Sequence, residues 1–453
     1  MSLRILFVAA EATPFSKVGG LADVAGSLPQ ALAARGHDVR LVTPKHHANE
    51  PGNPHREITL PFRGTDCTLR IDQVDLANSA KALVIGDDNY FPRQAVYGEP
   101  DDLDRYLFFS QAALELPRKL DWRPDIIHLN DWHTGPIAYA LRNYGWNDEF
   151  YRHAASVFTI HNLRYRGPDN FVDLIGPAIF YADAVTTVSP TYAREILTPE
   201  LGEGLHELLQ TRRGSLYGVL NGIDYDEFNP ATDERIEASF DADSLNKRPA
   251  NRSALRRRLG LEDSEKPLVA MVTRLSEQKG IDIALEALTQ TVGDGQVQTA
   301  ILGAGDRTYE EAAAALAAAH PTNATVTIGF DATLAQQLYA GSDFFLMPSR
   351  FEPCGLGQMI AMRYGSIPIV RRTGGLADTV PDAADDGLGF VFEEYSSAAV
   401  SSTLERAVTA FRQSASFRDL QLRAMSADFS WGASAAAYEG IYEETLNSRS
   451  KRG

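Results

Sequence analysis

The chain has 453 residues, which exceeds one ordinary domain and favours two large ones. Hydrophobic residues make up 44% of it and charged residues 23%, as in globular proteins with full-sized cores, so a largely disordered chain is excluded. The formal net charge of -17 disfavours nucleic acid and anionic membranes as partners, whereas a neutral polymer or a small anion held by a few basic side chains is compatible with it.

The cysteine content and the lengths of the apolar runs indicate the cellular compartment in which we expect the chain. Only Cys67 and Cys354 occur, so we expect neither a disulfide framework nor a cysteine zinc site, and a reducing, cytoplasmic location is the natural expectation. The N-terminal apolar run meets the charged Glu11 too soon for a signal peptide. No apolar run approaches the roughly 18 residues of a membrane-spanning helix, so we expect none.

Short apolar runs rich in Val, Ile and Leu alternate with longer amphipathic stretches. This alternation is typical of parallel strands buried between helices and predicts an α/β fold. In the first half we expect strands at 3–9, 39–43, 126–129, 157–160, 184–188 and 217–220. In the second half we expect them at 268–272, 298–302, 325–328, 344–347 and 367–370.

The segment 229–267 lies between these two sets of strands and is charged and polar. We expect a linker with one short helix there, and its basic run at 256–258 to form a solvated helix face. The alanine-rich stretch 310–319 predicts a surface helix. Near the C-terminus, apolar residues at helical spacing predict a last helix that docks on a core, and these are Tyr438, Ile441, Tyr442 and Leu446.

The loop after the first expected strand carries a lysine and paired glycines. Gly19 and Gly20 permit close approach of the backbone, and the following helix offers N–H groups at its positive end. Lys17 adds a point charge suited to a phosphate. We therefore expect an anion site here; the alternative is a tight turn with a solvated lysine.

The word Gly-Gly-Leu-Ala-Asp begins at Gly19 and occurs again at 374–378, after a strand of the second half. Because the copies occupy different places in their halves, they indicate two similar loops, one per domain, placed to face each other across a cleft. Two common nucleotide-binding fingerprints are absent from the sequence: Gly303 and Gly305 lack the third glycine of a dinucleotide-binding loop, and no Walker A motif occurs. A dehydrogenase or a P-loop ATPase is therefore disfavoured.

A stronger cluster follows the strand expected at 268–272. Arg274 and Lys279 bracket the start of a helix there. Two cations beside a helix N-terminus suit a diphosphate that gains charge as a bond to it breaks. The alternative is an exposed loop with two solvated cations.

A carboxylate and a glycine-rich turn follow the strand expected at 344–347. Glu352 can accept hydrogen bonds from sugar hydroxyls, and the N–H groups of 355–357 suit phosphate oxygens. We expect Cys354, between them, to be a packed small side chain rather than a nucleophile.

In the first half, polar residues end two of the expected strands. Asp131 and His133 follow one strand, and His161 and Asn162 follow the next. Ligands of open α/β sheets bind at the carboxyl ends of strands. A lone histidine is usually a satisfied structural residue, but an imidazole and a carboxylate ending separate strands favour a site.

With these motifs the chain closely resembles, along nearly its whole length, the glycogen and starch synthase family. The resemblance is carried by the stretches 17–24, 130–133, 161–163, 189–193, 221–224, 274–280 and 349–358. It implies the GT-B fold, in which two Rossmann-like domains with doubly wound parallel sheets face each other across a cleft. It places the catalytic and acceptor domain at 1–235 and the sugar-nucleotide domain at 236–429, and a final helix at about 430–453 returns to the first domain.

The resemblance also implies the activity. Glucose passes from ADP-glucose, or UDP-glucose, to the 4-hydroxyl at the non-reducing end of an α-1,4-glucan such as glycogen, with retention of configuration and without a metal or other cofactor. The alternatives are a glycosyltransferase of this architecture with a different acceptor, and a glucan-binding protein without turnover. Because position 360 is Ile360, no second carboxylate follows Glu352 there, and attack from the front face and a covalent intermediate both stay open.

The family's site residues are carried over position by position. The resemblance implies catalytic roles, including stabilisation of the departing diphosphate and of the anomeric carbon, for Lys17, Asp131, His161, Arg274, Lys279 and Glu352. It implies donor binding by Gly19, Gly20, Asn221, Phe330, Cys354, Gly355, Leu356 and Gly357, with Phe330 against the base. Asp23 and Asn162 are expected on the acceptor side.

The chain departs from the family pattern in three places. Between Gly167 and Phe171 it is shorter than the longer bacterial members, which bears on how it contacts a glucan. Arg164 and Arg166 stand where neutral residues are common and predict a more basic acceptor surface. Gly357 replaces the Thr or Asn often found in its turn.

Overall fold

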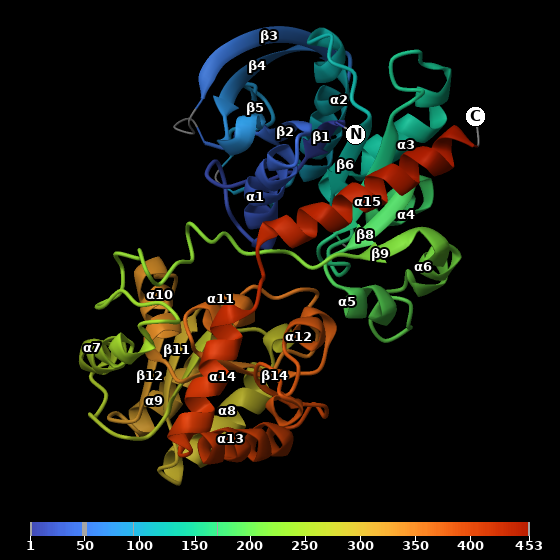
Figure 1. Cartoon of the computed structure of the whole chain (residues 1–453). Helices are drawn as coiled ribbons and strands as arrows, with labels where there is room; N and C mark the ends of the chain where they lie inside the picture. Colours follow the sequence, from blue (N-terminus) through green and yellow to red (C-terminus); the bar gives the residue numbers. More distant parts are fainter. Residues whose placement is uncertain (1, 48–51, 94, 170, 452–453) are drawn as a thin grey trace. The chain divides into compact units, whose positions relative to one another are not determined.

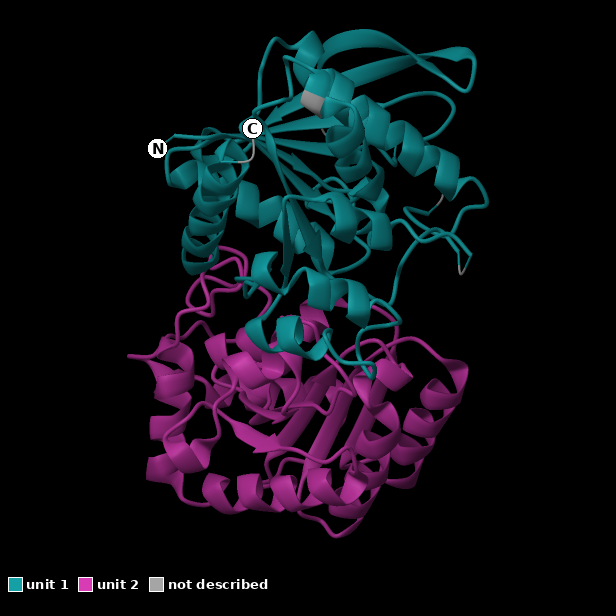
Figure 2. Cartoon of the chain, turned by 90° about the vertical axis from the view of Figure 1, so that its right-hand side faces the viewer, with its two compact units in different colours: residues 1–222, 431–453 teal, residues 223–430 magenta. Residues whose placement is uncertain are grey.

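The computed structural model describes residues 2–47, 52–93, 95–169 and 171–451, which form two compact units. Unit 1 comprises residues 1–222 and 431–453, and unit 2 comprises 223–430 (Figure 2). The division lies ahead of the boundary at 235/236 that the sequence led us to expect. The reason is a set of contacts that hold the intervening segment in unit 2: Ile223 donates its N–H to Phe429 O over 2.8 Å, and the Tyr364 hydroxyl donates to buried Asp233 over 2.6 Å.

Unit 1 contains, within its described residues, a nine-stranded sheet with the order β3-β4-β5-β2-β1-β6-β7-β8-β9 (Figure 1). Its strands are β1 Arg4–Val8, β2 Asp38–Pro44, β3 Asn53–Phe62, β4 Thr65–Asp75, β5 Lys81–Gly86, β6 Ile126–Asn130, β7 Ala155–Ile160, β8 Ala184–Thr187 and β9 Leu216–Gly218. All six strands expected in the first half are confirmed. Their central members are buried along their whole length, because helices cover both faces of a doubly wound sheet.

Three further strands, β3, β4 and β5, were not predicted from the sequence, and only parallel strands were expected. In fact β4 runs antiparallel to both β3 and β5. The first residues of β3 are exposed, and β4 alternates between buried and exposed side chains over most of its length. Strands such as β3 and β4, with one face in water, have no continuous apolar run to indicate them. That reason does not hold for β5, which is buried and carries the apolar run 82–85 but was not predicted.

The helices of unit 1 are α1 Gly20–Ala34, α2 Asp102–Lys119, α3 Gly135–Asn143, α4 Ile175–Tyr181, α5 Pro190–Glu195, α6 His206–Thr211 and the C-terminal α15 Trp431–Ser450. The last helix docks on a core, as expected. It packs against α1 and β7, and Tyr438, Ile441 and Tyr442 are buried in the same apolar cluster as Phe7 (Figure 1). The Tyr442 hydroxyl lies 2.6 Å from Nδ1 of His128 in β6.

Unit 2 contains a six-stranded, wholly parallel sheet with the order β12-β11-β10-β13-β14-β15 in the part of the chain that the structure describes. Its strands are β10 Leu268–Val272, β11 Gln298–Gly303, β12 Ala324–Ile328, β13 Phe344–Met347, β14 Ile367–Arg371 and β15 Phe390–Phe392. The five strands expected in the second half are confirmed. Only the three-residue β15 was missed, because it is too short to give a pattern.

The helices of unit 2 are α7 Pro249–Leu259, α8 Ile281–Gly293, α9 Arg307–Ala319, α10 Ala332–Gly341, α11 Gly357–Arg363, α12 Gly374–Thr379, α13 Ser397–Phe411 and α14 Ser414–Ser426. The alanine-rich surface helix is confirmed as α9. The expected solvated face of α7 is wrong for Arg256, which is buried and donates to Gln298 Oε1 over 2.9 Å, whereas Arg257 and Arg258 are exposed. A buried guanidinium needs such a partner, and only the fold supplies it.

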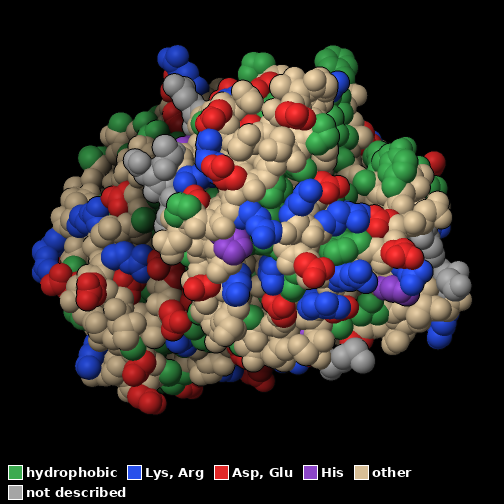
Figure 3. Space-filling view, turned by 90° about the horizontal axis from the view of Figure 1, so that it is seen from above, with side chains coloured by type: hydrophobic (Ala, Val, Ile, Leu, Met, Phe, Trp, Pro, Cys, Tyr) green, Lys and Arg blue, Asp and Glu red, His purple; other side chains and the backbone are tan. Residues whose placement is uncertain are grey.

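Charged side chains of both signs share the surface. Figure 3 shows one face on which Lys and Arg side chains are interspersed with Asp and Glu. The negative net charge is therefore not spread as a uniform field on that face. Among the described residues, no helix is long and apolar enough to cross a bilayer.

Candidate active site

Each sheet has a place beside its first strand where the strand order reverses direction. In unit 1 it lies between β1 and β6, and in unit 2 between β10 and β13, and both pairs of strands are parallel and adjacent. Loops that leave such a pair at its carboxyl ends turn in opposite directions and leave a crevice, which is where ligands of α/β sheets bind. The candidate catalytic residues follow these four strands or, in the case of His161, the adjacent β7.

The loop after β1 already binds a carboxyl group, and this group is a side chain of the protein. Glu11 Oε2 accepts hydrogen bonds from the N–H groups of Val18, at 2.5 Å, and Gly19, at 3.2 Å. Lys17 Nζ lies 2.6 Å from Asp23 Oδ1, so the expected phosphate contact and the expected acceptor-side carboxylate are paired with each other. Gly20 begins α1. The N–H groups of this loop are thus not all available, contrary to the expectation from the sequence.

Glu11 was missed as a site residue. Its carboxylate is buried, which raises its pKa, and the Tyr97 hydroxyl donates a hydrogen bond to it. One signal was present in the sequence: an ionisable residue stands three positions after a strand that is buried at every position after its first. Tyr97 had no such signal, because it comes from a loop far along the chain.

Asp131 and His161 are brought together at the ends of β6 and β7. The Asp131 backbone has φ 55° and ψ -176°, a region that a residue other than glycine adopts only under strain. In this conformation Asp131 Oδ1 accepts the N–H of His161 over 2.8 Å. Burial raises the pKa of Asp131 to about 7, so near neutrality the carboxyl group is balanced between its two protonation states.

The His161 ring is held in one orientation by Asn130. The Asn130 amide nitrogen donates to Val8 O over 3.0 Å, so its oxygen faces the imidazole and accepts from His161 Nε2 over 2.9 Å. Burial lowers the pKa of His161 to about 3. The ring is therefore neutral at physiological pH, with its proton on Nε2.

The neighbouring polar residues of unit 1 differ in their surroundings. His133 is buried and its ring stacks on that of Tyr97, with centroids 4.6 Å apart. Asn162 Oδ1 accepts the N–H of Arg164 over 3.1 Å. Asn221 is buried, and its Oδ1, which is also buried, has no hydrogen-bond partner within the described part of the chain.

In unit 2 the structure brings Lys279 and Glu352 into contact. Lys279 Nζ donates to Glu352 Oε2 over 2.6 Å, and the buried Ser349 hydroxyl donates to the same oxygen over 2.9 Å. Both bonds end on Oε2, so Oε1 of Glu352 remains able to accept a hydrogen bond from a ligand.

The other expected donor-side residues of unit 2 differ in their exposure. Arg274 is exposed, and no ion pair joins it to another of the residues described. Phe330 follows β12 and is 91% exposed, which is unusual for an aromatic ring without a partner. Cys354 is buried, as expected for a packed side chain.

The glycine-rich turn after Glu352 presents backbone donors. Gly355 has φ 73°, a value that favours glycine, and Gly357 begins α11. In the described structure, neither Gly355 nor Leu356 donates its N–H to another residue. A Cβ atom at 357 in place of glycine would lie 3.0 Å from the Phe345 ring, a close contact that the ring would have to relieve by shifting.

The remaining departures concern unit 1. In the shortened segment, Asn170 lies outside the described residues. Arg164 is exposed, but Arg166 is paired with Asp173, so only one of the two adds uncompensated positive charge.

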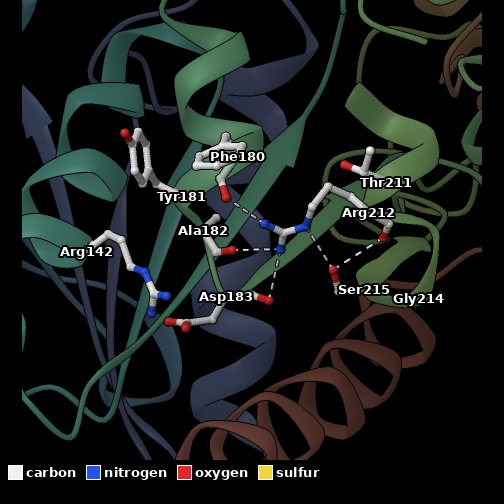
Figure 4. A pocket seen from close by; sticks show the side chains of 9 residues that line it. All are labelled: Arg142, Phe180, Tyr181, Ala182, Asp183, Thr211, Arg212, Gly214 and Ser215. Carbon is white, nitrogen blue, oxygen red and sulfur yellow. Dashed lines mark hydrogen bonds between the residues drawn. The ribbon is translucent and has the colours of Figure 1, made fainter. Parts of the chain in front are cut away.

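A pocket of about 470 Å³ in unit 1 contains none of the expected site residues. Arg212 crosses it and donates to the carbonyl oxygens of Phe180, Ala182 and Asp183 at the end of α4 (Figure 4). Its guanidinium is therefore engaged in capping a helix. No group of three or more His, Cys, Asp or Glu residues suited to a metal ion occurs in the part of the chain that was described.

Comparison with known proteins relates this geometry to a family. Residues 4–211 match the model of the starch synthase catalytic domain, and residues 253–417 match that of glycosyl transferases group 1. The chain is 44% identical to the glycogen synthase of Geotalea daltonii, over 98% of this chain and 99% of the relative. It is 39% identical to the glycogen synthase of Bacillus subtilis, again over 98% and 99%.

Solved structures show the same relationship. The catalytic domain of starch synthase IV from Arabidopsis thaliana, bound to ADP and acarbose, has a TM-score of 0.89 and 34% identity, covering 99% of this chain and 100% of that one. Sucrose-phosphate synthase from Thermosynechococcus elongatus, at 19% identity over 98% of this chain and 100% of that one, shares the fold with a TM-score of 0.67. The expected GT-B class, with two Rossmann-like units, is confirmed. Identity at this level over almost the whole length shows that the chain belongs to the glycogen and starch synthase family of glycosyltransferases.

Proposed function

We propose that this chain is a glucan synthase that transfers glucose from ADP-glucose to the non-reducing end of an α-1,4-glucan and retains the α configuration. The observation that carries the proposal is the hydrogen-bonded set of Lys279, Glu352 and Ser349 after β10 and β13 of unit 2. In this set, Lys279 can bind a diphosphate and Glu352 can bind a sugar hydroxyl. The diphosphate and the sugar are the two parts of a sugar nucleotide on either side of the bond that breaks.

Unit 2 supplies the donor site in this proposal. Arg274 and Lys279 stabilise the negative charge that develops on the departing diphosphate, and the N–H groups of Gly355, Leu356 and Gly357 bind its oxygens. Glu352 binds the glucose through Oε1. Phe330 stacks on the base, a role supported by the almost complete exposure of its ring.

Unit 1 supplies the groups for the reacting carbon and the acceptor. The transition state has positive charge at the anomeric carbon, which the Asp131 carboxylate and the His161 carbonyl stabilise. The neutral His161 ring adds no opposing charge, in keeping with its lowered pKa. Lys17, beside Gly19 and Gly20, contacts a phosphate once it leaves Asp23, and Asn221 makes a donor contact. Asp23 and Asn162 contact the acceptor.

ADP-glucose is the proposed donor because the related starch synthase IV structure is described as bound to ADP and acarbose. UDP-glucose is the second candidate, since one exposed aromatic ring can stack on either base. We propose a reaction without a metal ion, in which Arg274 and Lys279 supply the positive charge that a cation gives other transferases.

The test is release of nucleoside diphosphate from ADP-glucose and, separately, from UDP-glucose, each with and without glycogen. Glycogen-dependent release from ADP-glucose is expected, together with new linkages that an α-1,4-specific hydrolase removes. Release without a need for glucan would indicate a different acceptor. No release from either donor, although glycogen binds, would indicate a glucan-binding protein without turnover.

A further inference from the structure

The second Gly-Gly-Leu-Ala-Asp copy packs against the loop that follows Glu352. It forms α12, directly after β14. A Cβ atom at Gly374 would lie 1.9 Å from Glu352 O, and one at Gly375 would lie 2.1 Å from Cys354 O. Such distances are far inside van der Waals contact, so both glycines are required for backbone approach. The Gly375 N–H also donates to Glu352 O over 3.0 Å.

Two side chains complete this contact. Gln358 Nε2 lies 3.1 Å from Cys354 O, 3.0 Å from Gly355 O and 3.1 Å from Thr379 Oγ1. The Thr379 hydroxyl donates to Gly375 O over 2.6 Å. The single proton of the Thr379 hydroxyl is used in this bond, so Thr379 Oγ1 accepts a hydrogen bond from Gln358 Nε2. The three polar atoms around Nε2 are therefore all acceptors. The side chain therefore has its nitrogen toward the loop.

Because the peptide bond is planar, this contact also orients backbone N–H groups of the loop. In a trans peptide the C=O of one residue and the N–H of the next lie in one plane and point in opposite directions. Gln358 holds the carbonyls of Cys354 and Gly355, and the N–H groups of those same two peptide units belong to Gly355 and Leu356. Holding the carbonyls therefore aims both N–H groups away from Gln358.

We propose that Gln358 and Thr379 are positioning residues for the donor diphosphate. Through one hydrogen-bonded chain from Gly375 O to Thr379 and Gln358, they fix the two peptide planes whose N–H groups bind phosphate oxygens. This inference rests on the proposed function, in which Gly355 and Leu356 contact the donor. Both side chains are almost completely buried, Gln358 at 0% and Thr379 at 2% exposure, so neither touches the substrate itself.

The test compares Thr379→Val, Thr379→Ser and Gln358→Met with the unaltered chain. Thr403→Val is the matched control, because Thr403 is also buried and also donates to the carbonyl four residues earlier, but in α13. ADP affinity is measured by calorimetry, kcat and KM by nucleotide release, and stability by the thermal midpoint. Amide hydrogen exchange of Gly375 in the ligand-free chain reports directly on its hydrogen bond to the Glu352 loop.

We expect Thr379→Val and Gln358→Met each to weaken ADP binding about tenfold, and the double variant to weaken it little further, because both act through one chain of hydrogen bonds. Exchange at Gly375 should quicken in both. Thr379→Ser should restore affinity, and Thr403→Val should lower the thermal midpoint without changing affinity.

ADP affinity within twofold of the unaltered chain, with unchanged exchange at Gly375, would show that the two residues serve stability alone and overturn the inference. An unaltered chain that binds neither ADP nor UDP would instead reject the proposed function, and with it the part of the inference that concerns the donor. The exchange measurement would still decide whether the side chains hold the loop.

Discussion

Lys279 and Glu352 are 73 residues apart in the sequence, yet Lys279 Nζ lies 2.6 Å from Glu352 Oε2. They meet because Lys279 follows β10 and Glu352 follows β13, which are parallel neighbours at the point where the strand order of unit 2 reverses. Both side chains are largely buried, so the ion pair is shielded from water and keeps the lysine in place before a donor arrives.

Glu352→Gln tests this pair. The substitution keeps the shape of the side chain but removes the charge that holds Lys279, so we expect kcat to fall roughly 100-fold. Nucleotide release under saturating donor and glycogen measures it. Glu311→Gln is the matched control, because Glu311 pairs with Arg307 on the exposed surface of α9 and should leave kcat unchanged. A kcat within a factor of three for Glu352→Gln would remove Glu352 from the mechanism.

Lys17→Ala should lower kcat more than it weakens donor binding. Lys17 is half exposed and paired with Asp23, so in the ground state its charge is already compensated. Its interaction with the diphosphate should count most when charge develops there, and we expect a loss of roughly 10- to 100-fold in kcat with a small change in KM. Steady-state kinetics with varied ADP-glucose separate the two constants. An unchanged turnover number would contradict the assignment.

Phe330→Ala tests contact with the base. Stacking of a base on an aromatic ring contributes about 1 to 2 kcal/mol, so KM for the sugar nucleotide should rise roughly 5- to 30-fold while kcat changes little. Phe180→Ala removes a ring that is 60% exposed in unit 1 and should leave KM for the donor as it was. If both substitutions had the same effect, Phe330 would not be a specific contact.

Asp131→Asn should abolish activity and stabilise the fold at alkaline pH. Because burial raises the pKa of Asp131 to about 7, the folded state retains a proton that the unfolded state has lost above about pH 4. The stability this group contributes is complete below pH 4 and is lost as the pH rises through 7. At pH 8 the neutral amide avoids this loss, and we expect about 2 to 4 kcal/mol more stability than in the unaltered chain.

Denaturant unfolding at pH 5 and pH 8 checks this expectation. The difference between Asp131→Asn and the unaltered chain should be larger at pH 8. Equal differences at the two pH values would show that Asp131 ionises at its ordinary pH in the folded chain.

His128 should make the protein sensitive to acid. Burial between Tyr442 and Thr159 lowers the pKa of His128 to about 3, so the folded state excludes a proton that the unfolded state binds below about pH 6.5. The stabilisation is present above pH 6.5 and is lost as the pH falls toward 3. By pH 4.5 the expected loss is about 2 to 3 kcal/mol.

His128→Gln should therefore show a smaller fall in unfolding free energy between pH 7 and pH 4.5. His153→Gln, at an exposed position, is the control and should follow the unaltered chain. A fall of the same size in all three proteins would show that other groups account for the acid sensitivity.

The strands show which parts of the fold can be predicted from the sequence alone. Most strands buried along their length were predicted, because an uninterrupted apolar run is a local property of such a strand, but the buried strands β5 and β15 were missed. The antiparallel β4, with one face exposed, was missed along with its neighbours β3 and β5. Buried Arg256 was mistaken for a surface residue, because its partner Gln298 comes from a different element.

The candidate site shows the same limit. The polar residues that follow buried strands were found, Asp131, His161 and Glu352 among them, since a charged or polar residue at the end of an apolar run stands out. Glu11 also follows such a strand, but that it accepts the N–H groups of Val18 and Gly19 cannot be read from residue types.

By itself, the sequence determined the α/β class, the positions along the chain of most buried strands and the residues that end them, because these depend on hydrophobic periodicity over a few neighbouring positions. Only the tertiary structure decided which of those residues meet. The pairing of Lys279 with Glu352, the hydrogen bond from the His161 N–H to Asp131 and the contact of Gln358 with Thr379 all arise from strand order and helix packing, which join residues distant along the chain.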